Sequence, residues 1–329
     1  MSAGSGASRS TTRKRIVLDT DPGIDDALAI LYLAGTPDAE IVAVGAAPGN
    51  ISTTLAAENA LRLLDLIEQP HVPVAVGPPA PLRQSPEASS AHGEDGLGGE
   101  AGPASARRPV AESAAEQLVR LARSRPGELS VLALGPLTNL ALALLLEPEL
   151  PSLLREVVWM GGAVHAPGNR TPHAEFNAWH DPEAAERVLA GGFALTMVPL
   201  DATAAAHADP DWVAAVAESG HPRAQFATRI LKHYVDFYER AIGLRGCLMH
   251  DPLAAAVMLD PGLVGSCEER QVAVELTGTH TRGMTVTDRR PYRRPGGDPR
   301  GPVRVVVAAD TATMLDRMRH ALFAIEQQP

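Results

Sequence analysis

Cysteine, lysine and long apolar runs are scarce in this sequence. The two cysteines, Cys247 and Cys267, show no metal or redox spacing, so we interpret them as ordinary thiols in a reducing compartment. Met1 to Lys14 is rich in Ser, Thr and Gly and lacks the apolar stretch of a signal peptide, which predicts a disordered tail and a cytoplasmic protein. Apolar runs such as Leu140 to Leu146 are far too short to cross a bilayer.

Acidic side chains outnumber basic ones, 39 to 29, and the formal net charge is −10. This charge argues against nucleic acid or an anionic membrane as a main partner. Lys14, in the tail, and Lys232, in a predicted helix, are not placed to bind phosphate, and no Gly-Lys-Ser/Thr loop is present. Apolar residues make up 45% of the chain, enough for a substantial core, and no linker divides it. We therefore expect one domain over residues 15–329.

Short apolar runs alternate with helical patterns through the first two-thirds of the chain. This order predicts an α/β fold with a mostly parallel central sheet and helices on both faces. Strands are expected at Ile16–Leu18, Glu40–Ala46, Val74–Val76, Leu129–Leu134, Glu156–Met160 and Leu195–Val198. Helices are expected at Ile24–Leu33, Ser52–Ile67, Ala111–Arg123, Leu137–Leu146 and Pro182–Leu189.

The remaining third is less regular. A helical block spans Asp211 to Leu259, and a final helix is expected from Thr311 to Glu326. Three short apolar runs lie between them, near Val272–Leu276, Met284–Val286 and Val303–Val307. The segment 78–109 is too long for an ordinary βα connection, so it is interpreted as functional or disordered, and the Arg-rich loop 289–300 as a solvated excursion.

Carboxylates are concentrated at one predicted turn, in Asp19-Thr20-Asp21-Pro22-Gly23-Ile24-Asp25-Asp26-Ala27. A buried strand precedes it, and helical spacing resumes at Ile24. Two charges about 6 Å apart repel by roughly 3 kcal/mol at an effective dielectric near 20, whereas a helix N-terminus offsets only ~0.3–1 kcal/mol per anion. Oxygen ligands without cysteine favour a hard divalent cation, Ca²⁺ or Mg²⁺. The alternative is that Asp25 and Asp26 merely occupy a first helical turn.

Other polar motifs follow the predicted strands directly. Ligands of a doubly wound sheet bind beyond the carboxyl ends of its strands, so these motifs should converge there. Each also has a purely structural interpretation, as a cap, a turn or a surface residue, and only their convergence favours a site. They are Gly49-Asn50, His92 to Leu97, Gly135 to Asn139, Met160-Gly161-Gly162 with Asn169 and Glu175-Phe176-Asn177, and His250-Asp251-Pro252.

The acidic motif at 19–27 closely resembles the amino-terminal motif of the inosine–uridine-preferring nucleoside hydrolases, and the resemblance extends from Ile16 to the last helix. It implies the nucleoside hydrolase fold with its Rossmann-like core, Ca²⁺ as cofactor, a nucleoside as the small-molecule substrate, and a homodimer or homotetramer. The stretch Tyr234 to Arg245 matches the family's base-contacting helix more loosely: Tyr238 fits, but no arginine is assigned to the position that follows it in relatives.

The resemblance also implies roles for single residues. The Ca²⁺ ligands would be the carboxylates of Asp21, Asp26 and Asp251 and the backbone carbonyl of Leu134. His92 and His250 match histidines near the nucleobase. The ribose-binding positions would be Asp25, Asn50, Met160, Asn169, Glu175 and Asn177.

These parts predict hydrolysis of an N-glycosidic bond. We expect Asp21 to act as general base on a water that the cation acidifies, with inversion at the anomeric carbon. Amide and carboxylate dipoles, including that of Asn177, would stabilise an oxocarbenium-like sugar, and His250 or His92 would protonate the departing base. A metal-dependent phosphatase and a metal-stabilised binding domain are the competing classes. Release of free ribose distinguishes the three.

Overall fold

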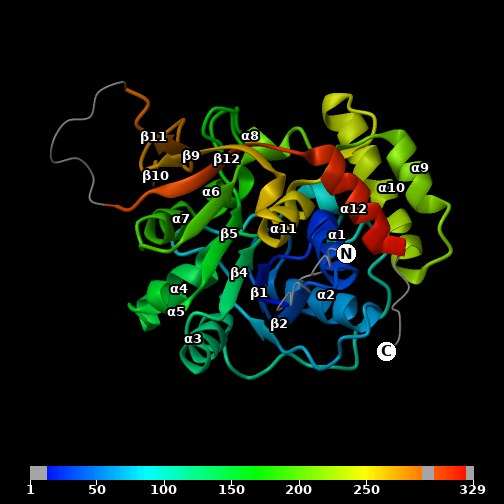
Figure 1. Cartoon of the computed structure of the whole chain (residues 1–329), viewed down its shortest axis with the longest axis horizontal. Helices are drawn as coiled ribbons and strands as arrows, with labels where there is room; N and C mark the ends of the chain where they lie inside the picture. The colour runs from blue at the N-terminus through cyan, green and yellow to red at the C-terminus, as the bar shows by residue number, and fades with distance from the viewer. Residues whose placement is uncertain (1–12, 291–299, 324–329) are drawn as a thin grey trace, which may run out of the picture.

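The computed structural model describes residues 13–290 and 300–323, and its centre is an eight-stranded sheet (Figure 1). The strand order is β3-β2-β1-β4-β5-β6-β12-β9. All neighbouring strands are parallel except β9, which runs antiparallel to β12. The strands are β1 (Lys14–Thr20), β2 (Ala39–Ala46), β3 (Val74–Val76), β4 (Leu129–Ala133), β5 (Glu156–Met160), β6 (Leu195–Val198), β9 (Val264–Arg270) and β12 (Val303–Ala309).

Helices cover both faces of the sheet, as the sequence predicts, and bury two apolar clusters (Figure 1). One face packs against α1 (Ile24–Ala34), α2 (Thr53–Leu66), α10 (Pro222–Ile242), α11 (His250–Leu259) and α12 (Thr311–Phe323). The other packs against α3 (Ala114–Ser124), α4 (Thr138–Leu146), α5 (Leu150–Leu153) and α7 (Pro182–Leu189). The remaining short elements are η1 (Ser90–His92), α6 (Phe176–His180), α8 (Leu200–Thr203), β7 (His207–Ala208), α9 (Pro210–Ala217) and β8 (Cys247–Leu248).

Strand β4 shows why continuous apolar runs mark central strands. All five of its residues are buried because β1 and β5 flank it and helices cover both faces. Strand β9 is not predicted by the sequence because it is an edge strand with a mostly polar sequence, VGSCEER, and no buried residue. Edge strands are commonly polar, which protects them from pairing with other chains.

The predicted amino-terminal tail is one residue too long. Lys14 is the first residue of β1 and not part of a tail: its ammonium lies 2.8 Å from Glu156 Oε1. Residues 1–12 of the expected tail lie outside the described residues. The final helix was expected from Thr311 to Glu326; α12 begins at Thr311 and is described to Phe323, and residues 324–326 lie outside the described residues.

The predicted runs near residues 272 and 284 form an antiparallel pair, β10 (Val272–Val274) and β11 (Thr285–Thr287), separate from the main sheet. The loop predicted at 289–300 falls almost wholly outside the described residues. No helix in the described part of the chain is long and apolar enough to span a membrane.

The segment 78–109 is an ordered loop held at Asp95. Its carboxylate accepts hydrogen bonds from the backbone N–H groups of Leu97, Gly99 and Ala101, at 2.9, 2.9 and 3.0 Å. The side chain of Asn59 on α2 donates to the Asp95 carbonyl at 2.8 Å. These bonds fix the loop that carries His92.

Candidate active site

The turn between β1 and α1 buries three carboxylates, those of Asp21, Asp25 and Asp26. Asp26 accepts hydrogen bonds from the Thr20 hydroxyl and from the Gly23 N–H, the latter at 2.9 Å, so the carboxylate folds back over its own helix N-terminus. Asp21 Oδ2 accepts from the Asn50 N–H at 2.6 Å, which connects the turn to the end of β2. Local backbone donors therefore fix both carboxylates.

Two glycines of the predicted motifs make room for Asp21. A Cβ at Gly49 would overlap Asp21 Oδ2, and a Cβ at Gly135 would overlap Asp21 Oδ1. The ends of β2 and β4 thus approach this carboxylate from two sides, and only glycine permits the approach. Asp21 Oδ1 is buried and has no hydrogen-bond partner among the described residues.

A cluster of acidic groups forms where Asp251, at the start of α11, reaches the turn. Oxygens of Asp25, Asp26 and Asp251 lie within 4.8 Å of one another. Burial, followed by the charges of Asp25, Asp26 and Asp21, raises the pKa of Asp251 well above its ordinary value. Burial, followed by the charge of Asp26, also raises the pKa of Asp21 well above its ordinary value. Without a cation these carboxylates favour their protonated, neutral forms. The closely spaced oxygens of the cluster and the unpartnered oxygen of Asp21 are the type of ligand that a hard divalent cation binds.

Asp19 does not take part in this cluster, contrary to the expectation that four carboxylates meet at the turn. Its Oδ1 accepts from the Asn139 side chain on α4 at 2.7 Å. Burial raises its pKa to about 7. Asn139 also donates to the Ala46 carbonyl at 3.0 Å, so the Thr138-Asn139 motif supports the sheet.

Asn177 connects the ends of two strands. Its amide donates to the carbonyls of Leu134, at 2.7 Å, and Met160, at 3.0 Å. The predicted carbonyl ligand at Leu134 is thus close to the ribose-binding candidates at the end of β5. A carbonyl oxygen has a second lone pair, so this hydrogen bond leaves Leu134 able to bind a cation.

Glu175 is the N-cap of α6. Its carboxylate accepts from the N–H groups of Gly162, Asn177 and Ala178, at 2.7, 2.8 and 3.1 Å. Burial nevertheless raises its pKa to about 7. Asn169 is exposed at the rim, and its side-chain oxygen accepts from the Phe176 N–H at 2.9 Å.

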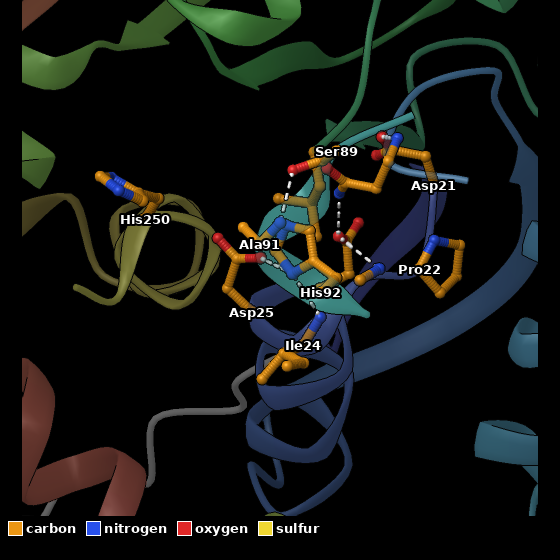
Figure 2. A network of polar contacts seen from close by, with 12 residues as sticks. Asp21, Pro22, Ile24, Asp25, Ser89, Ala91, His92 and His250 are labelled. Carbon is orange, nitrogen blue, oxygen red and sulfur yellow. Dashed lines mark hydrogen bonds and ion pairs between the residues drawn. The ribbon is translucent and has the colours of Figure 1, made fainter. Parts of the chain in front are cut away.

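Rings form a wall beside the carboxylates. His92 stacks on Tyr234 with ring centroids 5.5 Å apart, and Tyr234 meets Tyr238 edge-on at 5.0 Å. Figure 2 shows His92 beside Asp25, with helix α11 and His250 beyond them. His92 Nδ1 accepts from the Ile24 N–H at 3.0 Å and lies 3.8 Å from Asp25 Oδ1. Burial lowers the pKa of both His92 and His250 to about 4.

These groups surround a cavity of about 810 Å³. Asp21 and Asp26 do not line it because both are completely buried. The other predicted site residues do line it, namely Asp25, Asn50, His92, Leu134, Met160, Asn169, Glu175, Asn177, Tyr238, His250 and Asp251.

Thr203 was missing from the sequence prediction. It is completely buried in α8, and its hydroxyl lies 2.8 Å from His250 Nδ1. In the same helix, Asp201 accepts from the N–H groups of Val164 and His165 and so holds the loop after β5. The signal was available: α8 directly follows β6, whose carboxyl end lies at the same edge of the sheet.

A sequence model described as inosine-uridine preferring nucleoside hydrolase matches residues 16–316. The chain belongs to this family. The nucleoside hydrolase of Crithidia fasciculata named inosine-uridine preferring is 39% identical over 285 residues, 86% of this chain and 89% of that protein. A probable uridine nucleosidase 2 of Arabidopsis thaliana is 38% identical over 277 residues, 83% of this chain and 85% of its own.

Solved nucleoside hydrolases share the architecture. The plant enzyme PpNRh1 superposes with a TM-score of 0.91 at 29% identity, covering 95% of this chain and 99% of its own. A purine-preferring ribonucleoside hydrolase from Gardnerella vaginalis superposes with a TM-score of 0.87 at 31% identity, covering 94% of this chain and 98% of its own. The relatives and the structural neighbours are thus ribonucleoside hydrolases, which cleave N-glycosidic bonds, as the sequence motif predicts.

Proposed function

We propose that this nucleoside hydrolase uses Ca²⁺ to cleave purine or pyrimidine ribonucleosides, such as inosine or uridine, into ribose and free base. The observation that supports it best is the composition of one cavity. Buried carboxylates adjoin one part of it, and the rings of His92, Tyr234, Tyr238 and His250 form another. Hydroxyl groups and a cation suit the first part, and a planar base suits the second.

The cation would be held by the carboxylates of Asp21, Asp26 and Asp251 and by the Leu134 carbonyl. The chemistry of these donors supports a bound cation, because all of them are buried oxygens. Burial and mutual repulsion also raise the pKa of the Asp251 carboxyl. A bound hard cation would lower the pKa of water and hold sugar hydroxyls.

Asp21 is the proposed general base. Its Oδ2 is engaged by the Asn50 N–H, whereas Oδ1 has no partner among the described residues and is therefore able to accept a proton from water. A general base in position contributes about 10²–10⁴-fold to the rate. Direct attack by water implies inversion at the anomeric carbon.

The ribose would be held by Asp25, Asn50, Met160, Asn169, Glu175 and Asn177. Departure of the base leaves positive charge on the sugar, which nearby carbonyl and carboxylate oxygens stabilise. The amide of Asn177 fixes the Met160 carbonyl at 3.0 Å, so this acceptor is preorganised.

His250 is the proposed donor to the leaving base, with His92 as a second one. Because His92 Nδ1 accepts the Ile24 amide proton, the neutral His92 ring carries its own proton on Nε2. His250 Nε2 lies 3.1 Å from the Tyr238 hydroxyl, so Tyr238 orients the imidazole.

A phosphatase fits this cavity less well. Among the described residues that line it, Arg170 is the only lysine or arginine, and it pairs with Glu87 and stacks on Trp179, 4.3 Å from the ring centroid. Lys14 is engaged with Glu156. Phosphoryl transfer needs cationic groups on the phosphate.

The test is a panel of nucleosides assayed for free ribose and free base, with and without a chelator. Ribose release that a chelator stops and Ca²⁺ restores is expected. Ribose release from none of inosine, uridine, cytidine, adenosine and guanosine contradicts the proposal. Phosphate release from nucleotides would support the phosphatase instead. We also propose a homodimer or homotetramer in the cytoplasm, which light scattering and cell fractionation would test.

A further inference from the structure

The antiparallel pair β10–β11 lies outside the main sheet, yet one of its side chains reaches the loop that follows β5. Thr285 is the first residue of β11 and is 2% exposed. Its hydroxyl accepts a hydrogen bond from the Ala163 N–H at 3.0 Å and donates one to the Ala163 carbonyl at 2.6 Å. A single side chain thus pairs both backbone groups of a buried residue in this loop.

The same loop fixes the carboxylate of Glu175. The N–H of Gly162, the residue before Ala163, donates to Glu175 Oε2 at 2.7 Å. Gly162 has φ +78°, and a Cβ on it would lie 2.1 Å from Met197 Cε and 2.9 Å from Thr285 Cγ2. Only glycine permits this backbone conformation and this close approach. The contact between Thr285 and the loop therefore lies one residue away from the group that binds Glu175.

Other contacts hold Thr285 in place. Strand β10 lies beside α7 (Figure 1). Arg282, in the connection between β10 and β11, pairs with Glu183 of α7 at 2.8 Å. At Gly283 the connection approaches the backbone of α6, where an added Cβ would lie 2.6 Å from Trp179 Cα. The pair is thus anchored on α7 and on α6, the helix that Glu175 caps.

We propose that Thr285 is a positioning residue for ribose binding, because it holds the Gly162 N–H against the carboxylate of Glu175. This inference rests on the proposed function, in which Glu175 binds the ribose. Glu175 lines the cavity, whereas Thr285 does not, so Thr285 acts through the loop and not by touching the substrate. Without the hydroxyl, the two buried backbone groups of Ala163 lose their partner. An unpaired buried group is costly, so the loop shifts to satisfy them and takes the Gly162 N–H with it.

The experiment starts from Thr285→Val, which has nearly the same shape but no hydroxyl. For the nucleoside that the wild type cleaves best, we expect KM to rise about tenfold and kcat to change less than threefold. Glu175 is proposed to bind the sugar equally before and during the reaction, and losing such an interaction raises KM alone. A merely structural defect inactivates a fraction of the molecules, which lowers kcat and leaves KM unchanged.

Two further variants at this position complete the series. Thr285→Ser keeps the hydroxyl and should keep KM within twofold of the wild type. Thr285→Ala removes the hydroxyl without adding volume, and it replaces Thr285→Val if that variant does not fold.

Thr287→Val is the matched control. Thr287 lies two residues later in the same strand, and its buried hydroxyl has no hydrogen-bond partner among the described residues. The substitution therefore makes the same chemical change in the same strand without breaking a hydrogen bond. KM should stay within twofold of the wild type.

Glu175→Ala tests whether the effect passes through Glu175. In the wild-type background Thr285→Val should lower kcat/KM about tenfold. In the Glu175→Ala background it should lower kcat/KM less than threefold, because the carboxylate that it positions is gone.

Several outcomes overturn this inference alone, with the wild type active. They are an unchanged KM in the variants that lack the Thr285 hydroxyl, an equal rise of KM in Thr285→Ser or Thr287→Val, and the full tenfold loss in the Glu175→Ala background. Ribose release from no nucleoside by the wild type contradicts the proposed function instead.

Discussion

The Tyr238 hydroxyl lies 3.1 Å from Nε2 of His250, at the contact between α10 and α11. The opposite ring nitrogen of His250 lies 2.8 Å from the Thr203 hydroxyl. Burial, aided by the nearby His92, lowers the pKa of His250 to about 4, so its ring is neutral at pH 7. Hydroxyls on both sides hold the ring in one orientation, and a neutral ring stores no spare proton. His250 can therefore assist the leaving base only during the reaction itself.

His250→Ala should lower kcat for inosine about 10²–10⁴-fold and change KM much less, because the lost interaction forms in the transition state. p-Nitrophenyl riboside has a leaving group that needs no proton, so the variant should hydrolyse it almost normally. Steady-state kinetics on both substrates measures this. Equal losses on both would make His250 a positioning residue and direct the search for the acid to His92 or solvent.

Asp21→Ala should reduce kcat by at least about 10²-fold while the far-UV circular dichroism stays unchanged, because the carboxylate is proposed both to bind the cation and to deprotonate water. Asp19→Asn is the control: Asp19 is a buried carboxylate two residues earlier that contacts Asn139 outside the cavity. It should retain most of the activity. An Asp21→Ala enzyme with more than about a tenth of wild-type kcat would refute the role of Asp21.

The acidic turn and its surroundings were accessible from the sequence for a physical reason. Buried parallel strands are continuous apolar runs, and their carboxyl ends share one edge, so Asn50, Asn177 and Asp251 could be brought together without knowing any distance. The direction of a side chain was not accessible. Asp19 and Asp21 belong to one motif, yet Asp19 contacts Asn139 on α4, whereas Asp21 accepts from the Asn50 N–H and lies against Gly49 and Gly135.

Thr203 illustrates a second limit. The end of β6 marks the region of the sheet, but the contact of Thr203 with His250 depends on how α8 packs against α11, which no local pattern encodes. Strand β9 was missed for a different reason: its exposed polar sequence carries no apolar signal, although its backbone pairs with β12.

Elemental analysis of the purified protein should find about one calcium per chain and neither zinc nor iron, since the cluster offers only oxygen ligands. Chelation should lower the melting temperature, because removing the cation restores the repulsion among the carboxylates. A bound cation at 100 times its Kd would contribute about 2.7 kcal/mol of stability, which the chelator removes. Asp251→Asn should abolish this response to calcium, whereas Asp19→Asn should preserve it. Tightly bound zinc or iron would overturn the assignment.

His180 supplies a pH prediction away from the carboxylate cluster. The side chain is completely buried in α6, and neither ring nitrogen has a hydrogen-bond partner among the described residues. Burial lowers its pKa to about 4; the charge of Glu87 acts in the opposite direction, and that of Arg170 adds to the lowering. In the unfolded chain the pKa of histidine is about 6.5.

Between pH 6.5 and pH 4 the unfolded chain therefore binds a proton at His180 that the folded chain does not. The stability contribution is fully present above pH 6.5 and falls as the pH drops, by about 3 kcal/mol in total once the pH is below 4. Urea unfolding at pH 7.5 and pH 5 measures the difference in the free energy of unfolding. His180→Phe should reduce that difference by about 1–2 kcal/mol, whereas His173→Phe, at an exposed position, should not. An unchanged difference in His180→Phe would show that burial of this imidazole does not disfavour its protonation.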